Sequence, residues 1–391
     1  MSQTLMVTYR QGTHRLLPPE QTLARLSPHL IEFGITRCAD VTRLDEDLGM
    51  PVFMAIRPRG RVFQSSAGKG LHVTAAKVSA LMEAVELDVA ERPAPTRLRR
   101  ASRSELLAEG HRVDALPEWA AAAGRFFSDR FRIGWTLAED LLHGGEVWVP
   151  AGAAYFCEPT PCRTNTNGLA SGNHLIEATL HGLYEVIERD AVARLVEGDR
   201  LAIGRHCRVI APTSVSDSAL AAVIQKIQRA NTKVVLLQVL SGLAVPTYWA
   251  LLLNRQPFAG ISTLNAGYGT HLDGTVALSR ALSEAVQSRL TLIHGSRDDI
   301  VEKPVYTRQA AGGHATGDSP AFRFFDALEP TAPAVAEAYD GDFHAAFQQV
   351  LSLLRQAGHE RVYRVDLRCP VPDFSVVKIL TPSLMYHGDL M

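Results

Sequence analysis

The stretch TNTNGLASGNHLIEATLHGLYEVIERDA, residues 164–191, decides the fold and holds the main candidate site. Its opening is rich in Asn and Gly, which predicts a turn that leads into a long helix. Viewed down the axis of that helix, at 100° per residue, Glu188 is rotated about 20° from Glu177, and Glu185 is rotated about 80° from Glu177. Apolar residues fill most of the other side: Leu175, Ile176, Leu180, Leu183, Val186 and Ile187. A row of acids on one flank is either a solvated face or the wall of a cation site.

Length and composition limit the class of protein. The chain has 391 residues, 46% hydrophobic and 21% charged, which is typical of a soluble globular protein. Its 40 basic and 41 acidic residues give a net charge of −1, which argues against nucleic-acid or membrane-surface partners. We find neither a transmembrane run nor a signal-peptide core at the N-terminus, so we expect a cytoplasmic protein.

The cysteines predict neither a disulfide framework nor a zinc site, because they are odd in number and scattered. Whether any of them is functional stays open at this point. They are Cys38, Cys157, Cys162, Cys207 and Cys369.

Two further segments repeat the arrangement of the first. The sequence SSAGKG at 65–70 precedes a helix expected over 74–91, and NAGYGTH at 265–271 precedes one expected over 274–294. We interpret each as a Gly-bearing loop followed by a helix with polar groups on one flank. The flank of the earlier helix carries Ser79, Glu83 and Glu86, and that of the later helix carries Arg280, Glu284 and Gln287.

The remaining pattern indicates an α/β protein with a peripheral segment at 92–130 and a polar, Gly-rich loop at 308–321. A short helix is expected between Pro19 and Pro28, and an Ala-rich helix near the end of the chain. Strands are expected at 51–56, 62–64, 145–150, 154–156, 233–240, 248–253, 361–366 and 376–380.

The acidic pairs Glu83-x-x-Glu86 and Glu185-x-x-Glu188 are the sharpest chemical signal. Each pair places two carboxylates on adjoining positions of one helix face. Either pair alone is typical of a solvated face, but two pairs that face each other could hold Mg²⁺ together with water and phosphate oxygens. The lack of His and Cys clusters favours Mg²⁺ over Zn²⁺.

The other polar residues near these motifs have two readings each. Gly68-Lys69-Gly70 fails the phosphate-loop pattern, and it is either an anion-binding turn or a tight turn with an exposed Lys. Arg280 and Glu284 either serve the same pocket or form an intrahelical pair of little energetic value. We expect four nearby histidines on the surface or in loops: His72, His174, His181 and His271.

The three blocks SSAGKGLHVTAAKVSALMEAVE, NGLASGNHLIEATLHGLYEVIERDA and AGYGTHLDGTVALSRALSEAVQSR resemble the signature blocks of the YcaO family, in family order. The resemblance implies one α/β domain over 58–391, with residues 1–57 as a leading part of the same fold. It also implies mixed sheets flanked by helices, with a nucleotide between the three motif helices. Family members use ATP and Mg²⁺ to phosphorylate the oxygen of a peptide backbone amide after a nucleophile has attacked its carbon.

The resemblance also implies roles for individual residues, although it assigns no catalytic residue. The Mg²⁺ ligands would be Glu83, Glu86, Glu185 and Glu188. The ATP-contacting residues would be Lys69, Ser79, Asn173, Glu177, Arg189, Arg280 and Glu284.

The ends of the chain favour one branch of the family. Azoline-forming members often end in a Pro-rich tail, which the ending TPSLMYHGDLM lacks. The N-terminal stretch GITRCADVTRLDEDLGMPVFMAIRP is more similar to the branch that works with a TfuA-type partner, which is associated with thioamidation. We therefore expect thioamide formation in a ribosomally made peptide or protein, with a TfuA-like or leader-binding partner, and the resemblance implies a homodimer. The alternatives are an azoline-forming cyclodehydratase acting on Cys, Ser or Thr, and a nucleotide-binding scaffold that regulates a partner complex.

Overall fold

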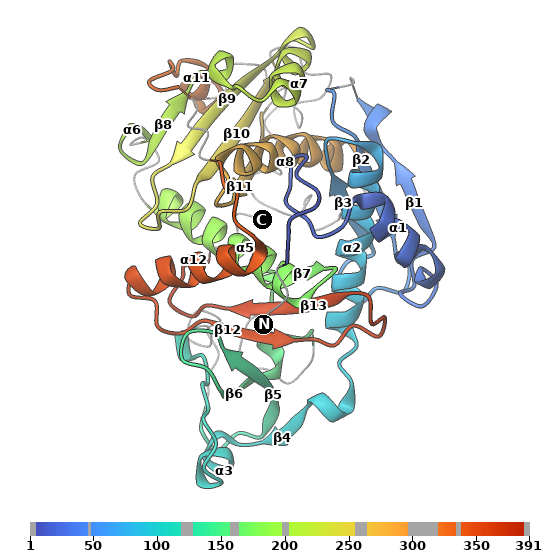
Figure 1. Cartoon of the computed structure of the whole chain (residues 1–391), viewed down its shortest axis with the longest axis vertical. Helices are drawn as coiled ribbons and strands as arrows, with labels where there is room; N and C mark the ends of the chain where they lie inside the picture. Colours follow the sequence, from blue (N-terminus) through green and yellow to red (C-terminus); the bar gives the residue numbers. More distant parts are fainter. Residues whose placement is uncertain are drawn as a thin grey trace.

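Three sheets and the helices between them form the fold (Figure 1). The structure is a computed structural model, and it describes residues 5–45, 48–118, 128–156, 164–197, 203–254, 264–295, 320–333 and 338–386. The expected α/β class and single domain are confirmed, and the ladders between the described strands are antiparallel.

Two of the sheets are each built from one continuous part of the chain, whereas the third combines strands from the middle and the C-terminal part. The first contains β1 (Arg37–Asp40), β2 (Val52–Ile56) and β3 (Ser65–Lys69) in that order. The second has the order β11 (Leu264–Thr270), β10 (Thr247–Asn254), β9 (Thr232–Val239) and β8 (Cys207–Ile210). The third has the order β4 (Arg99–Ala101), β5 (Ile133–Asp140), β12 (Tyr363–Asp366), β13 (Ser375–Leu380) and β7 (Leu169–Gly172), and β6 (Glu146–Pro150) pairs with β5.

Three long helices meet in the middle of the molecule, and each directly follows one strand of a different sheet (Figure 1). They are α2 (Val73–Glu91) after β3, α5 (Leu175–Glu197) after β7, and α8 (Gly274–His294) after β11. Asp273 caps α8 by accepting hydrogen bonds from Thr275 N at 2.9 Å and Val276 N at 3.1 Å. Gly295, with φ of 65°, ends that helix, so its bounds agree with those expected from the sequence. The shorter helices are α1 (Pro19–Leu26), α3 (Arg103–Ala108), α6 (Ile203–His206), α7 (Ser218–Arg229), α11 (Pro320–Asp326) and α12 (Phe343–Gln356).

The segments expected to be Gly-bearing loops contain the strands β3, β7 and β11, so that expectation is wrong. Gly and Ser have low strand propensity, which explains the misreading. Their role is close packing of strand and helix: a Cβ on Gly68 would lie 2.0 Å from Ala80 N. A Cβ on Gly267 would lie 2.1 Å from Ala285 N, and one on Gly269 would lie 2.0 Å from Ala277 O. Only glycine therefore allows α2 and α8 to lie this near to their strands.

Two other expectations are corrected. The strand expected at 62–64 lies instead at 65–69, where it pairs with β2 from Ser65↔Ile56 to Lys69↔Val52. The apolar run 154–156 is not a strand, because Ala154 N and Tyr155 N both bind Ala151 O in a turn. The loop expected at 308–321 lies outside the described residues except for 320–321, which begin α11. Cys157 and Cys162 also lie outside them, and the described cysteines Cys38, Cys207 and Cys369 are free.

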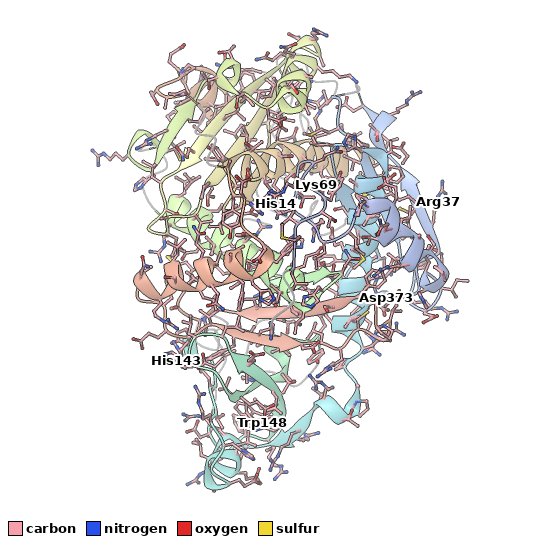
Figure 2. The ribbon with its side chains drawn as sticks, viewed as in Figure 1. His14, Arg37, Lys69, His143, Trp148 and Asp373 are labelled. Carbon is pink, nitrogen blue, oxygen red and sulfur yellow. The ribbon has the colours of Figure 1, made fainter. Side chains whose placement is uncertain are left out.

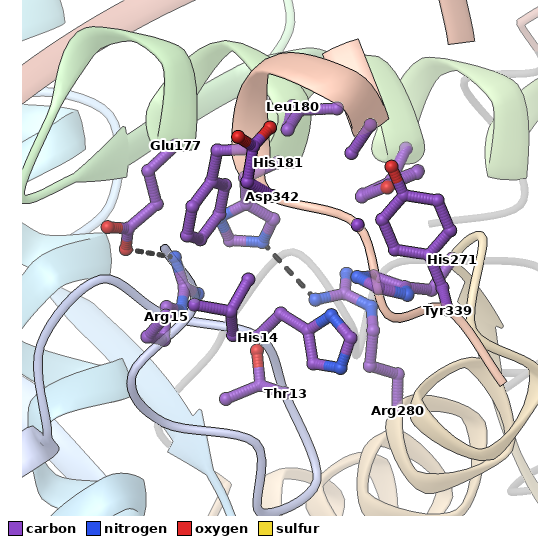
Figure 3. A pocket seen from close by; sticks show the side chains of 15 residues that line it. Thr13, His14, Arg15, Glu177, Leu180, His181, His271, Arg280, Tyr339 and Asp342 are labelled. Carbon is purple, nitrogen blue, oxygen red and sulfur yellow. Dashed lines mark hydrogen bonds and ion pairs between the residues drawn. The ribbon is translucent and has the colours of Figure 1, made fainter. Parts of the chain in front are cut away.

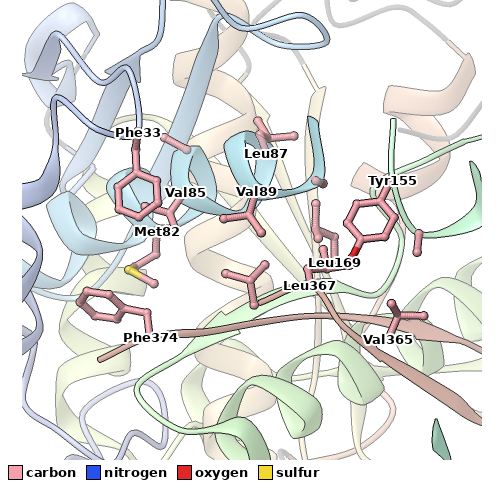
Figure 4. Packing of buried hydrophobic residues seen from close by; sticks show 14 of the residues in the cluster. Phe33, Met82, Val85, Leu87, Val89, Tyr155, Leu169, Val365, Leu367 and Phe374 are labelled. Atoms are coloured by element: carbon pink, nitrogen blue, oxygen red, sulfur yellow. The ribbon is translucent and has the colours of Figure 1, made fainter. Parts of the chain in front are cut away.

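Buried side chains hold the motif helices against their sheets. Figure 4 shows Val85 and Val89 of α2 packed in one cluster with Leu169 of β7 and Val365 of β12. A second cluster joins α7 and α8 to β9 and β10. A third joins α5 and α12 to β7 and β13. None of the described helices combines the length and apolar character that a membrane crossing requires.

The close approach of β11 and α8 can be tested with Gly267→Ala. The added methyl group would collide with helix backbone, which cannot move aside as a flexible side chain can. We expect the free energy of unfolding to fall by about 1–3 kcal/mol, measured by denaturant unfolding. The control is Gly242→Ala, where a Cβ meets nothing within 4 Å. Equal stability of the two variants would contradict the packing argument.

Candidate functional site

The first carboxylate pair, Glu83 and Glu86, lies on the half-buried flank of α2. Ser171, on the neighbouring strand β7, donates a hydrogen bond of 2.6 Å to Glu86 Oε1. Burial raises the pKa of Glu86 to about 8; the Ser171 hydrogen bond opposes this rise, and repulsion from Glu83 and Glu185 adds to it. The repulsion from Glu185 shows that the pairs on α2 and α5 are electrostatic neighbours.

The second pair, Glu185 and Glu188, lies on α5 and is more deeply enclosed. Glu188 is 1% exposed, and its Oε2 has no hydrogen-bond partner among the described residues. Burial, and next the charge of Glu284 on α8, raise the pKa of Glu188 to about 7. Burial also raises the pKa of Glu185, against the opposing charges of Arg189 and Lys378. The three motif helices therefore bring their acids together, with Glu188 buried and the other carboxylates half-buried.

Cations surround this group of acids. Lys69 Nζ, at the end of β3, lies 2.8 Å from Glu284 Oε2. Although burial favours the neutral acid, Lys69 and Arg189 lower the pKa of Glu284. Desolvation would lower the pKa of Arg189, but Glu284, Glu188 and Glu185 raise it above its ordinary value. Arg189 Nε is buried, and no residue in the described part of the chain accepts a hydrogen bond from it.

The arrangement fits a divalent cation. Buried carboxylates that repel one another, one with an unpaired oxygen, gain hydrogen-bond partners and charge balance when Mg²⁺ binds. Among the described residues no three His, Cys, Asp or Glu side chains lie close enough together to hold a metal ion between them. Mg²⁺ suits such an open site, because it is usually held by one or two carboxylates and completes its shell with water and phosphate oxygens.

A narrow cavity lies at the other end of the site, where α5 and α8 face the N-terminal segment (Figure 3). Its volume is about 30 Å³, enough for about two waters. Its walls include Glu177 and His181 of α5, Arg280 of α8, and His271, which precedes α8. Arg280 Nη1 lies 3.3 Å from His181 Nε2.

The N-terminal strap, residues 7–16, forms another wall of this cavity, and residues from Tyr339 to Ala346 complete its lining. Arg15 Nη1 lies 3.2 Å from Glu177 Oε1, and Leu16 N donates to Glu177 Oε2 at 3.2 Å. Both oxygens of Glu177, which is 2% exposed, are therefore bound by the strap. In Figure 2 His14 of the strap and Lys69 both lie toward the middle of the molecule.

The predicted site residues fall into two groups. The acids Glu83, Glu86, Glu185, Glu188 and Glu284 gather with Lys69 and Arg189, whereas Glu177 and Arg280 line the cavity. Asn173 Oδ1 accepts a hydrogen bond of 3.2 Å from Thr22 Oγ1 of α1, next to the strap. Ser79 is half-buried on α2, and within the described ranges it has no hydrogen bond or ion pair with another of these residues.

The expectation that the nearby histidines lie at the surface or in loops is wrong for His181, which is half-buried within α5, whereas His271 lies in the loop before α8 but is buried there. His271 is 7% exposed, and Asp273 N donates to its Nδ1 at 2.8 Å. Burial lowers the pKa values of His181 and His271 well below the ordinary range, and nearby Arg15 and Arg280 add to this. Both rings are therefore neutral at physiological pH. His72 is exposed and His174 is half-buried.

Sequence reasoning missed three residues of the site. His14 and Arg15 come from the N-terminal segment, and Arg15 lies 162 residues before Glu177, so no local spacing signals them. Lys378 is 1% exposed and interrupts the apolar strand 376–380, and a charge inside a buried strand was the available signal. Its Nζ donates to Asn165 O at 2.6 Å. Burial lowers the pKa of Lys378 to about 7, with Glu185 opposing the shift.

Comparison with known proteins gives the family. A family model described as YcaO cyclodehydratase, ATP- and Mg²⁺-binding, matches residues 67–385. An uncharacterised protein in the tfuA 3′ region of Rhizobium leguminosarum bv. trifolii is 34% identical over 95% of this chain and 88% of its own. An uncharacterised protein of Methanothermobacter thermautotrophicus is also 34% identical, over 94% of each chain.

Solved structures share the fold. The YcaO protein of Methanopyrus kandleri, bound with AMPPCP and Mg²⁺, matches with a TM-score of 0.76 and 23% identity, over 97% of this chain and 94% of that one. A heterocyclase in complex with substrate and cofactor matches with a TM-score of 0.75 and 22% identity, over 96% of this chain and 53% of that one. The family model spans most of the chain, and the relatives cover nearly all of it. The chain therefore belongs to the YcaO family, whose ligands are ATP and Mg²⁺.

Proposed function

We propose that this protein uses ATP and Mg²⁺ to activate a backbone amide of a peptide, and that it installs a thioamide with the help of a TfuA-like partner. The observation that carries the proposal is the meeting of three helices around buried, mutually repelling carboxylates, one with an unpaired oxygen. Phosphoryl transfer depends on metal and cationic groups around developing phosphate charge more than on a protein nucleophile.

The described residues divide the work. Glu83, Glu86, Glu185 and Glu188 would hold Mg²⁺, which supplies charge neutralisation at the phosphate oxygens. Lys69, Arg189 and Arg280 would add positive charge there, with Glu284 orienting Lys69 through the 2.8 Å contact. The nucleotide would be contacted by Asn173, Glu177 and Ser79. Arg15 would contact it as well, because Arg15 lies against Glu177. Residues 1–57 would be part of the same unit as 58–391, because β1 and β2 pair with β3 and the strap lines the site.

The choice of reaction rests on the relatives. The tfuA 3′-region relative supports a TfuA-like partner and hence thioamidation. The family description and the substrate-bound heterocyclase support the second candidate, cyclodehydration of Cys, Ser or Thr to azolines.

Glu86→Gln and Glu188→Gln test the metal site. With ATP, peptide and partner present, we expect turnover to fall at least about 100-fold in each variant, because a neutral amide is a poor Mg²⁺ ligand. The control, Glu360→Gln, changes an exposed residue and should leave turnover unchanged.

The metal-free Glu188→Gln protein should be at least as stable as wild type, because the change removes a buried charge. Full turnover in both site variants would rule out the assignment.

Product mass separates the two reactions. Exchange of oxygen for sulfur adds about 16 Da to the peptide, whereas loss of water in azoline formation removes about 18 Da. We expect the gain, measured by mass spectrometry after reaction with ATP, a sulfide source and the partner. A loss would assign cyclodehydration instead. ATP turnover that cannot be measured under any of these conditions would favour a regulatory scaffold.

The raised pKa values predict how metal binding depends on pH. In the metal-free protein Glu86 and Glu188 hold protons up to about pH 8 and about pH 7, and Mg²⁺ must displace them. We expect apparent Mg²⁺ affinity to rise as pH increases through this window and to level off above it. Because folding raises these pKa values, the same groups make the metal-free protein less stable as pH rises from about 4.5 toward 8. Calorimetric titration in buffers of different ionisation enthalpy would measure the released protons, and Glu86→Gln should release fewer.

A further inference from the structure

Lys378 occupies a position where a lysine is energetically unfavourable. It lies on β13 between two hydrogen-bonded neighbour strands, opposite Val365 of β12 and Leu169 of β7. Figure 4 shows these two partners in the apolar cluster that packs on α2. Val376 and Leu380, on the same face of β13, are 0% exposed. The ammonium group therefore has no route to solvent along its stem.

The direct partners of this ammonium group are neutral. Within the described part of the chain they are both oxygens of Asn165, with Nζ 2.6 Å from the carbonyl oxygen and 3.4 Å from Oδ1. Asn165 Oδ1 also accepts a hydrogen bond of 3.0 Å from Asn167 N, so the lysine fixes the turn that leads into β7. Burying a charged amine without a direct ion pair costs stability, and an apolar side chain of similar size would avoid that cost.

The turn that Lys378 holds leads directly to one carboxylate of the site. Leu169 N, at the start of β7, donates to Thr166 O of the turn at 2.8 Å, and Ser171 of the same strand donates to Glu86 Oε1 at 2.6 Å. Glu185 is the group whose charge acts on Lys378, and Lys378 is second only to Arg189 among the charges that favour ionised Glu185. Lys378 thus connects the Asn165–Asn167 turn with the second carboxylate pair. A position that is unfavourable for folding and adjacent to a site is typical of function maintained at the expense of stability.

We propose that Lys378 is a positioning residue, which holds the Asn165–Asn167 turn, and through it β7 and the Ser171–Glu86 contact, in the arrangement that accepts the metal ion. The inference rests on the proposed function, since it concerns the same site. The proposal predicts an effect opposite to that of the lysine charge. The positive charge alone would repel the metal ion, yet the lysine is expected to increase metal affinity. Removing the charge alone would strengthen metal binding, so weaker binding without it reports lost positioning.

Lys378→Met tests the proposal, because methionine fills the same space without the charge. We expect its Mn²⁺ affinity, measured by electron paramagnetic resonance with a non-hydrolysable ATP analogue, to be at least about 10-fold weaker than wild type. Its thermal unfolding midpoint without metal should equal or exceed that of wild type. Lys378→Arg, which keeps a cation, should recover part of the affinity.

Val376→Ala is the matched control, because it damages packing on the same face of the same strand. Its unfolding midpoint should fall while Mn²⁺ affinity stays at the wild-type value. Wild-type or tighter Mn²⁺ binding by Lys378→Met overturns the positioning role. Loss of both stability and affinity in both variants also overturns it, in favour of a purely structural lysine. A wild-type protein that binds no Mn²⁺ with the analogue overturns the proposed function itself.

Discussion

The burial of like-charged carboxylates is the constraint on which the rest of the structure depends. Glu86, Glu185 and Glu188 come from two helices, and Glu284 joins them from a third. Their mutual repulsion and loss of water oppose folding, as the raised pKa values of the first three show. Such a group persists only in a scaffold that cannot relax by separating the helices. The apolar clusters on the opposite sides of α2, α5 and α8 provide that scaffold.

Glycine is what makes the scaffold stiff. At Gly68, Gly267 and Gly269 the helix backbone lies where any side chain would be, so strand and helix are separated by less than a normal side-chain layer. A helix this near its strand has little freedom to shift, and small displacements meet backbone atoms at once. The repeated strand–helix unit therefore fixes three helices in position, and the acids are held at the place where these helices meet.

The sequence predicted what is local and missed what is remote. The bounds of α8 and the faces of α2 and α5 follow from 3.6-residue periodicity and capping, which act within a few residues. The strands β3, β7 and β11 were mistaken for loops because of their glycines. These glycines are needed for close packing against a helix that follows later in the chain, which local propensity does not show. The contact of Arg15 with Glu177 joins positions 162 residues apart, and no spacing rule reaches that far. The opposing charges are evident in the sequence as residue types, but only the fold pairs them.

The two ends of the site therefore differ in origin. The carboxylate group is built from residues inside the segment 67–385 that matches the family model. The wall opposite Glu177 is built by the strap, which precedes that segment. Because the strap binds both oxygens of Glu177 and lines the narrow cavity, changes in residues 7–16 alter the space beside α5 and α8. The strap acts on the carboxylate group only at a distance, through the charge of Arg15, which favours ionised Glu86. A protein built this way can vary what its site admits while the carboxylates on the three helices stay in place.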